Sequence, residues 1–469
     1  MFLKLRSEKI MKLNYNYIFE NIIILIYVLF GIIGWQFNYT VGAILTIILA
    51  ISLILIYNDF KYAIPACLIL LFSIGQDLVV EEIPYNIIIP VVVFFIFIVY
   101  FTIRNFKLEK LRSIKSCIGM IILSIGFIIP IFWATLITSE NMVFYVMYFS
   151  WLMYTLLYVL LCINLKKGSF RMMVFSFSWL SVFIGYELVI SCIRIYLDDP
   201  TLNILSYWYY VGWGLCNEAG IVLCFLLPFV CYEIYKSNTM KLSLLSCFKL
   251  LFALLGIFIT TSRGAILIGG VEVFLLGIVL LFTKHDLKLF KISLIFFPAL
   301  IAGTLIGIIY GIDYFIQQIH DQIFYQNFGL NGRDIIWASG ADTFLASTRN
   351  MIFGGGIVSD IEEVSVFNKM QYSFIVYHST TLEILVSSGI IGLVGLGIHL
   401  AEKYKMLFKK GFVFLLIFGI GYLMVDLYGM LDNTYGMYYY MVPLCIMMAS
   451  INVNDNFEIY HNSKLNYLF

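Results

Sequence analysis

The sequence predicts an all-α, polytopic membrane protein with about fourteen transmembrane helices. Of its 469 residues, 62% are hydrophobic and only 12% are charged, and the mean hydropathy is +0.96. Soluble domains carry roughly 25% charged residues. The apolar residues also fall in successive runs of about 18 to 25, each long enough to cross a hydrocarbon core about 30 Å thick. These observations exclude a soluble enzyme, a nucleic-acid-binding domain and a disordered chain.

The apolar runs lack the alternating pattern of barrel strands, so each is interpreted as a helix whose backbone groups bond within the segment. In chain order, the runs centre near Leu25, Leu49, Leu70, Val93, Ser124, Met153, Phe183, Gly220, Phe252, Phe274, Leu300, Ser388, Ile420 and Cys445.

The positions of Lys and Arg predict the orientation, because these residues favour cytoplasmic loops. With the N-terminus in the cytoplasm, most of the 29 basic residues fall in inner loops, among them Lys61, Lys166, Arg171, Lys249 and Lys403. Both termini are then cytoplasmic, and the N-terminal apolar stretch is an uncleaved anchor. The basic residues left on the outer face are Arg194, Arg263, Arg333, Arg349 and Lys369.

One long outer connection divides the chain into three parts. We expect transmembrane helices 1–11 in residues 1–311 and an extracytoplasmic loop with short helices in residues 312–377, between helices 11 and 12. Residues 378–469 then hold helices 12–14 and a cytoplasmic tail. A loop of this length is usually functional or disordered, and its aromatic content favours an ordered, functional loop.

A helix is predicted inside this loop. Arg333 opens it and Arg349 closes it. Apolar residues that recur at helical spacing predict one buried face, formed by Trp337, Ala341, Phe344 and Leu345. The glycines at 354–356 interrupt the pattern and mark a turn.

Arg263 lies where the ninth span ends and the tenth begins. Ser262 is a candidate N-cap, which places Arg263 in the first turn of a helix whose N-terminus faces outward. A helix N-terminus beside a guanidinium group favours a phosphate or diphosphate ligand. The alternative is an arginine that extends to the headgroups and anchors the helix there.

His378 directly precedes the twelfth span. Thr380 and Glu383 have the spacing of a capping box, which predicts that the helix begins just after the histidine. A neutral imidazole at the outer surface can act as a general base and take a proton from an attacking hydroxyl. The alternative is an interfacial histidine that only hydrogen-bonds to headgroups.

The basic residues of the outer face suggest one kind of chemistry. Arg263, Arg333 and Arg349, together with His378, can neutralise a diphosphate and deprotonate an alcohol. This is the equipment for transferring a group from a diphosphate without a metal. We expect no metal or other cofactor, because no carboxylate cluster in the sequence suggests a divalent ion.

Asn217 and Glu218 are polar residues within the eighth span. They lie about ten residues below its expected outer start, which is about 15 Å of helix. Such residues usually face a bundle interior or an aqueous cavity, so both can line a cavity open to the outside. Interhelical hydrogen bonding is the alternative for each residue.

Four stretches around the long loop resemble the O-antigen ligase and polysaccharide polymerase family of integral-membrane glycosyltransferases. They are Asn217-Glu-Ala-Gly with Pro228, Thr261-Ser-Arg-Gly-Ala265, Arg333…Trp337…Gly354-Gly-Gly356, and His378…Leu382…Leu385…Gly389-Ile-Ile-Gly-Leu393. Their order and their membrane side extend the resemblance from Tyr207 to Leu400.

The resemblance implies a metal-independent, inverting glycosyl transfer on the outer face of the cytoplasmic membrane. Donor and acceptor would be undecaprenyl-diphosphate-linked glycans, with a flippase and a chain-length regulator as further partners and no nucleic acid. His378 would be the base, and Arg263 and Arg333 would hold the diphosphate. The substrate-binding residues would be Arg349, Asn217, Glu218 and Trp337.

Three functions are compatible with these features. A polymerase would join lipid-linked repeat units, whereas a ligase would move a finished polymer to another acceptor. The abundance of Ile, Asn, Lys, Tyr and Phe suggests an AT-rich genome and favours the polymerase, since many low-GC bacteria lack an outer membrane. A flippase or transporter of the same lipid would predict an internal two-fold repeat, which the sequence does not show.

Overall fold

The computed structural model describes residues 2–73, 85–112, 114, 116–133, 142–198, 216–237, 239–283, 333–356, 377–430, 432, 434, 435 and 437–454. Only the backbone is described for residues 2–17, 85–89, 112, 142–147, 216, 263 and 333–335.

Every regular element in these ranges is a helix. The elements are α1 (Phe2–Gln36), α2 (Tyr39–Tyr57), η1 (Phe60–Tyr62), α3 (Ala63–Phe72), α4 (Tyr85–Asn105), α5 (Leu108–Arg112), α6 (Ile118–Ile128), η3 (Ile129–Phe132), α7 (Met142–Asn164), α8 (Ser169–Asp198), α9 (Cys216–Lys236), α10 (Met240–Ile259), α11 (Arg263–Thr283), α13 (Arg333–Leu345), α14 (Thr348–Phe353), α15 (Thr380–Phe408), α16 (Phe412–Tyr428) and α17 (Tyr438–Val453).

Among the described helices, seven are long and apolar enough to cross a membrane: α1, α2, α8, α9, α10, α11 and α15. Shorter apolar helices accompany them, α16 and α17 included. Each predicted span centre lies in one of these helices except Leu300, which is outside the described residues. Within the described residues the chain is therefore all-helical, and its apolar helices are typical of a polytopic membrane protein, as the composition predicts.

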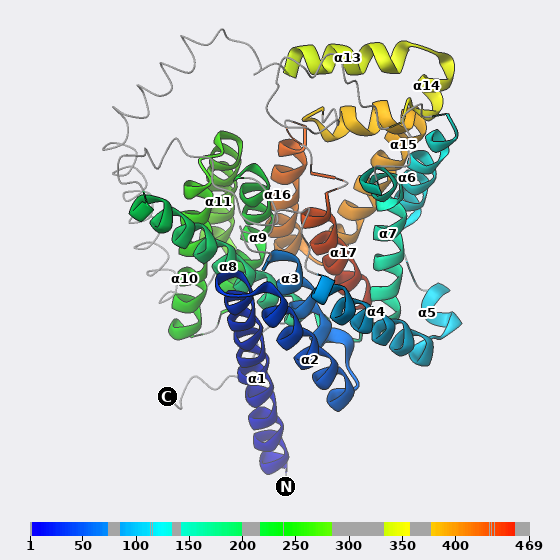
Figure 1. The fold of residues 1–469 in the computed structure, drawn as a ribbon. Helices are drawn as coiled ribbons and strands as arrows, with labels where there is room; N and C mark the ends of the chain where they lie inside the picture. Colours follow the sequence, from blue (N-terminus) through cyan, green and yellow to red (C-terminus); the bar gives the residue numbers. More distant parts are fainter. Residues whose placement is uncertain are drawn as a thin grey trace, which may run out of the picture.

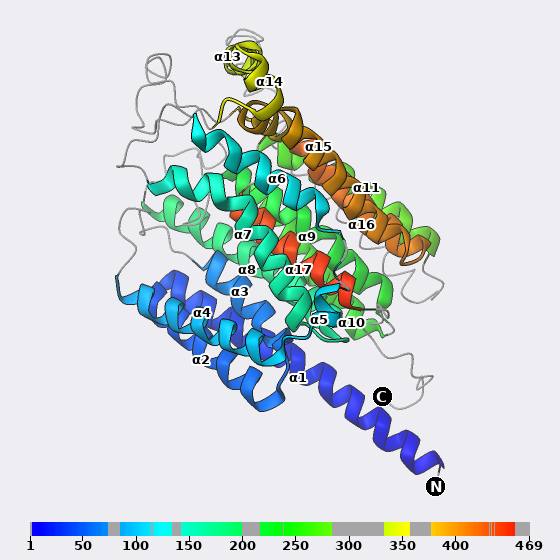
Figure 2. The same ribbon diagram turned by 90° about the vertical axis from the view of Figure 1, so that its right-hand side faces the viewer.

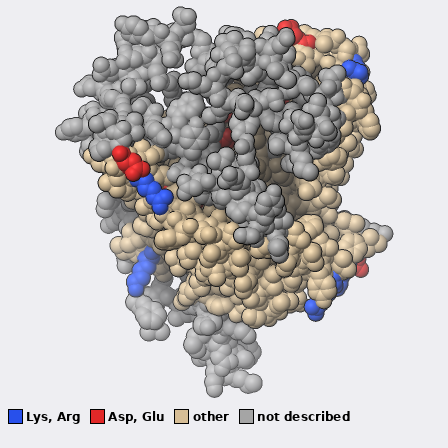
Figure 3. Space-filling view, viewed as in Figure 1, with Lys and Arg blue, Asp and Glu red and all other residues tan. Residues whose placement is uncertain are grey.

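The helices form one bundle with a covered end. Most of them pack side by side, while α13 and α14 lie across one end and α1 begins at the other (Figures 1 and 2). We call these the α13 end and the α1 end. In α9, 89% of the most apolar window is buried, against 39% in α2 and in α11, so α9 is central and the other two are peripheral. On the face shown in Figure 3, charged side chains are few and most lie near the edge of the described surface, while acidic atoms are visible in a recess in its upper middle.

Aromatic side chains pack the centre of the bundle. Phe177 of α8 meets Phe229 of α9 edge to face, with ring centroids 4.5 Å apart. Phe225 of α9 stacks on Tyr422 of α16 at 5.8 Å. Such pairs add about 0.5–1.5 kcal/mol each beyond the area they bury. These contacts fix α8, α9 and α16 against one another.

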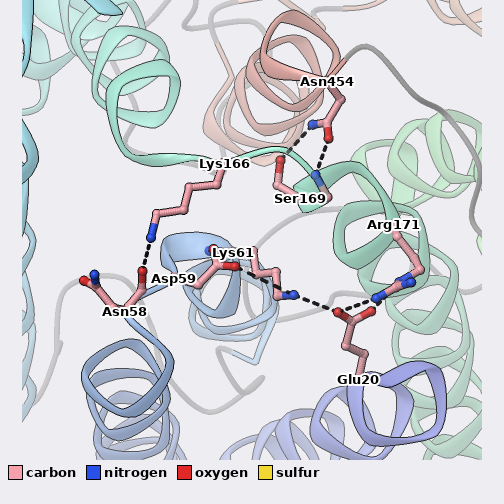
Figure 4. Close-up of polar contacts among 9 residues, drawn as sticks. Glu20, Asn58, Asp59, Lys61, Lys166, Ser169, Arg171 and Asn454 are labelled. Carbon is pink, nitrogen blue, oxygen red and sulfur yellow. Dashed lines mark hydrogen bonds and ion pairs between the residues drawn. The ribbon is translucent and has the colours of Figure 1, made fainter. Parts of the chain in front are cut away.

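A polar network joins loops at the α1 end. The Glu20 carboxylate of α1 accepts hydrogen bonds from Lys61 at 2.8 Å and from Arg171 Nε at 2.6 Å (Figure 4). Lys166 donates to the Asn58 carbonyl, and Asn454, just after α17, donates to Ser169 Oγ at 3.0 Å. Lys61, Lys166 and Arg171, which the sequence assigns to inner loops, therefore lie together.

Two of the lysines assigned to inner loops are buried within helices instead, and the prediction of a loop position for them was wrong. Lys249 lies within α10 and pairs with Glu233 of α9 at 2.9 Å, with each side chain only 1% exposed. Lys403 lies within α15 and pairs with Asp426 of α16 at 2.7 Å. A buried lysine is tolerated because a carboxylate with good geometry compensates its lost hydration.

The helix that follows the long loop is broken. Gly389 has φ 67° and ψ −163°, a conformation essentially restricted to glycine. The first part of α15 lies beneath α13 and α14, and the rest continues down the bundle (Figure 1). The twelfth span is therefore not one straight helix centred near Ser388. The break falls at the next residue and turns the segment after His378 along the α13 end.

A second glycine docks α14 onto this break. Gly354 ends α14 with φ 88°, in agreement with the turn predicted at 354–356. A Cβ on Gly354 would come within 3.0 Å of the Ser387 carbonyl, and one on Gly389 would come equally close to the Ile352 carbonyl. Real Cβ atoms do not approach so closely, so both positions require glycine for α14 and α15 to touch.

We expect Gly389→Ala to destabilise the protein by at least about 2 kcal/mol, because strain and a backbone clash add. Gly397→Ala is the matched control, since it lies in the same helix and a Cβ there meets nothing within 4 Å. Thermal unfolding of the purified protein in detergent measures both. Equal melting temperatures for the two variants would show that the break does not need a glycine.

Candidate active site

The start of α11 has the predicted local structure. Ser262 caps the helix, because its Oγ accepts from Ala265 N at 3.4 Å and its carbonyl accepts from Ile266 N at 2.9 Å. Arg263 is the first residue of α11. Its guanidinium group lies outside the described atoms, so the predicted diphosphate contact remains a proposal.

His378 directly precedes α15, as predicted, but the cap is one residue earlier than expected. Ser379 is the N-cap and its side chain accepts from Leu382 N, whereas Glu383 accepts from Tyr377 N at 3.2 Å. Thr380 does not cap the helix. Its hydroxyl accepts from Thr434 N at 2.9 Å instead, and this tertiary contact competes successfully with the local one.

The imidazole of His378 has a carboxylate partner that the sequence analysis missed. His378 Nδ1 lies 3.2 Å from Asp432 Oδ1, with the two side chains 41% and 13% exposed. An ionised carboxylate only accepts hydrogen bonds, so a neutral imidazole in this contact carries its proton on Nδ1 and has its lone pair on Nε2. The available signal was an Asp-Asn-Thr turn after the thirteenth span, on the same predicted face as the histidine.

Tyr428, at the end of α16, joins the two predicted stretches. Its hydroxyl hydrogen-bonds with Ser262 Oγ at 3.1 Å, and its carbonyl accepts from Asp432 N at 3.0 Å. A Cβ on Gly264 would come within 3.0 Å of the Tyr428 ring. The glycine after Arg263 therefore gives room for the residue that links α11 to the segment beside His378.

Helix α13 contacts Tyr377, the residue before the histidine. Trp337 Nε1 donates to the Tyr377 carbonyl at 2.7 Å, and Gly340 packs against the buried Tyr377 ring. Arg333 opens α13, as predicted, about one turn or 6 Å before Trp337. Its side chain is outside the described atoms. In the structure, this hydrogen bond from Trp337 positions the backbone next to His378. The contact of Trp337 with substrate, which the resemblance implies, remains a proposal.

The buried face of α13 differs from the predicted one. Ala341 and Leu345 are exposed, whereas Gly340 is buried and Trp337 and Phe344 are half-buried. The reason is that α13 lies across the end of the bundle and meets it through Tyr377 and α15, so only a narrow stripe is covered.

Asn217 and Glu218 lie in the first turn of α9, beside the start of α11. Gly220, one turn further, would clash through a Cβ with Ala265. Tyr439, at the start of α17, interacts electrostatically with both Glu218 and Asp432. Glu218 and Asp432 therefore both lie on the side of the bundle where α17 begins. The ten residues of helix expected above Asn217 are outside the described residues.

Arg349 lies on α14, apart from the other candidate site residues. It does not close α13, because that helix ends at Leu345 and Arg349 belongs to α14. Its guanidinium carbon lies 5.1 Å from the centroid of the Trp133 ring. Ser347 caps α14 and accepts from Asn350 N at 3.1 Å, which separates the two short helices.

The fold and the site define an integral-membrane protein with a histidine–carboxylate pair at the α13 end of its helix bundle. Residues 248–397 match the family model for O-antigen ligase, so this part of the chain is similar to that family and the predicted resemblance is confirmed. The match begins within α10, includes α11, α13 and α14, and ends within α15, and it supports an O-antigen ligase or polymerase type of function. No curated protein matches the chain.

We expect Thr380→Val to lower the free energy of unfolding by about 1–3 kcal/mol, because it leaves the buried Thr434 N–H without its acceptor. Thr380→Ser keeps the hydroxyl and serves as the matched control. Thermal unfolding together with amide exchange at Thr434 measures the effect. Unchanged protection of the Thr434 amide in the valine variant would contradict this role.

Proposed function

We propose that the protein is a repeat-unit polymerase that joins undecaprenyl-diphosphate-linked oligosaccharides at the outer face of the cytoplasmic membrane. In this proposal the chain has fourteen spans, the α13 end faces outward, and both termini are cytoplasmic. The family match and the apolar helices support the membrane glycosyltransferase class. The amino-acid composition, which suggests an AT-rich genome, favours the polymerase over the ligase. The ligase would use the same chemistry on another acceptor.

The observation that carries the proposal is the His378–Asp432 pair, with one imidazole nitrogen held and the other open. His378 Nε2 takes the proton of an acceptor hydroxyl while the hydroxyl oxygen attacks C1 of the donor sugar. The bond from C1 to the diphosphate oxygen breaks, and its electron pair leaves with the diphosphate. Attack from the opposite face inverts the configuration at C1.

Asp432 acts as a positioning residue in this step. It holds the Nδ1–H tautomer, and its negative charge stabilises the imidazolium that forms as the proton moves. Glu218 and Asn217 lie on the neighbouring helix start, where we propose that they contact the glycan.

Arg263 and Arg333 bind the departing diphosphate in this proposal. Each is the first residue of a helix, where backbone N–H groups and the helix dipole favour an anion. The start of α11 is linked to the segment beside the histidine by the hydrogen bond between Ser262 and Tyr428. Helix α13 is linked to it by the hydrogen bond from Trp337 to the Tyr377 carbonyl. Fixed cationic groups can supply the charge stabilisation that a leaving diphosphate requires.

We expect His378→Ala to slow chain extension at least about a hundredfold, as the loss of a general base does. Asp432→Asn should lower kcat by a similar factor with little change in KM, because it disturbs the tautomer and not the binding of substrate. The assay follows product length from lipid-diphosphate repeat units in vesicles that contain the purified protein.

Asp342→Asn is the control for both variants, since Asp342 is an exposed acid on α13. Asp432→Glu should restore part of the rate, which a merely structural role would not predict. Wild-type chain lengths from His378→Ala would refute the assigned chemistry.

A further inference from the structure

A second cationic group lies apart from the histidine. The exposed Arg349 side chain stacks on Trp133, which follows η3, and Trp133 Nε1 donates to the Gly354 carbonyl at 3.2 Å. Phe353 meets the same ring edge to face at 6.1 Å. The indole is therefore fixed from two sides, and it holds the guanidinium group in one place.

The separation from His378 follows from the backbone. Helix α13 touches Tyr377 beside the histidine, whereas α14 touches α15 near the break, where Gly355 N donates to the Val386 carbonyl at 2.8 Å. The helical segment Thr380–Ser388 between these contacts is about 12 Å long. Figure 1 shows α14 at the end of α13 that lies over the break.

The surroundings of Arg349 suit a phosphate that is attached to a lipid. The Arg349 side chain is exposed, and its guanidinium group makes no ion pair or hydrogen bond with another described residue. Phe132, the residue before Trp133, is 84% exposed, and Ile352 of α14 is 40% exposed, so exposed apolar side chains lie close in sequence to both members of the pair. An arginine on an aromatic ring binds phosphate through several N–H groups in a fixed plane.

We propose that Arg349 and Trp133 bind the lipid-linked diphosphate of the acceptor. The inference rests on the proposed polymerase function, in which the acceptor reacts at its non-reducing end and keeps its own lipid diphosphate. That diphosphate must then lie one repeat unit away from His378. The donor diphosphate, in contrast, lies beside the histidine, with Arg263 and Arg333. Two separate anion sites at a fixed spacing are what a polymerase requires.

The test compares two acceptors with one labelled lipid-linked donor. The first acceptor carries the lipid diphosphate through a non-cleavable phosphonate, and the second is the free oligosaccharide without lipid or phosphate. Arg349→Ala should reduce transfer to the first acceptor about tenfold at low acceptor concentration, the size of one lost charged contact. Transfer to the free oligosaccharide should be unchanged.

Arg194→Ala is the matched control. Arg194 also lies over a tryptophan, at 5.5 Å from the Trp35 ring, but it donates to the Gln36 side chain. This variant should transfer to both acceptors at the wild-type rate. Arg349→Lys should recover part of the loss, because it keeps the charge without the planar fork.

Several outcomes would overturn the inference. An equal loss on both acceptors would place Arg349 in the donor site or in the folding of α14, and no loss on either would remove it from binding. A defect seen only in vesicles with anionic phospholipid, and absent in zwitterionic vesicles, would assign it to bilayer headgroups. If wild-type protein elongates neither acceptor, the polymerase function itself fails.

Discussion

The contact between the start of α15 and the end of α16 determines the geometry of the α13 end. Thr380 N donates to the Gly429 carbonyl at 2.8 Å, and Thr380 Oγ1 accepts from Thr434 N at 2.9 Å. A buried backbone group that loses its partner costs about 1–3 kcal/mol, so the two helix ends stay together. The turn after α16 must therefore pass beside His378, and this brings Asp432 to the imidazole.

The same turn is held from inside the bundle by a buried ion pair. Asp426 accepts from Lys403 at 2.7 Å and from the Tyr435 hydroxyl at 2.7 Å, while Tyr435 N points at Thr380 Oγ1 at 3.4 Å. Removing one partner of a buried pair typically costs about 3–5 kcal/mol. Lys403 is thus part of the support for the site, which explains why a lysine near a predicted inner loop is buried.

Local sequence signals predicted the features that depend on neighbouring residues. The apolar runs gave the helices, Ser262 gave the cap before Arg263, and the glycines at 354–356 gave the turn after α14. Contacts between distant residues were not predictable in this way. The partner of His378 is 54 positions away, and the partners of Lys249 and Lys403 lie on other helices. The break at Gly389 was not predicted either, because an apolar helix that lies along a membrane surface has the same composition as one that crosses the membrane.

Helix α15 connects the candidate site to the helix bundle, because its first part lies along the α13 end and its second part enters the bundle. Its break needs the conformation of Gly389, and the docking of α14 there needs Gly354. The starts of α11 and α13 are tied to one end of the Thr380–Ser388 segment, and the segment just after α14, the helix of Arg349, is tied to the other. The spacing between these helix starts and α14 is therefore set by the backbone. In the proposed reaction, this rigid spacing selects acceptors by the distance from their reactive hydroxyl to their diphosphate.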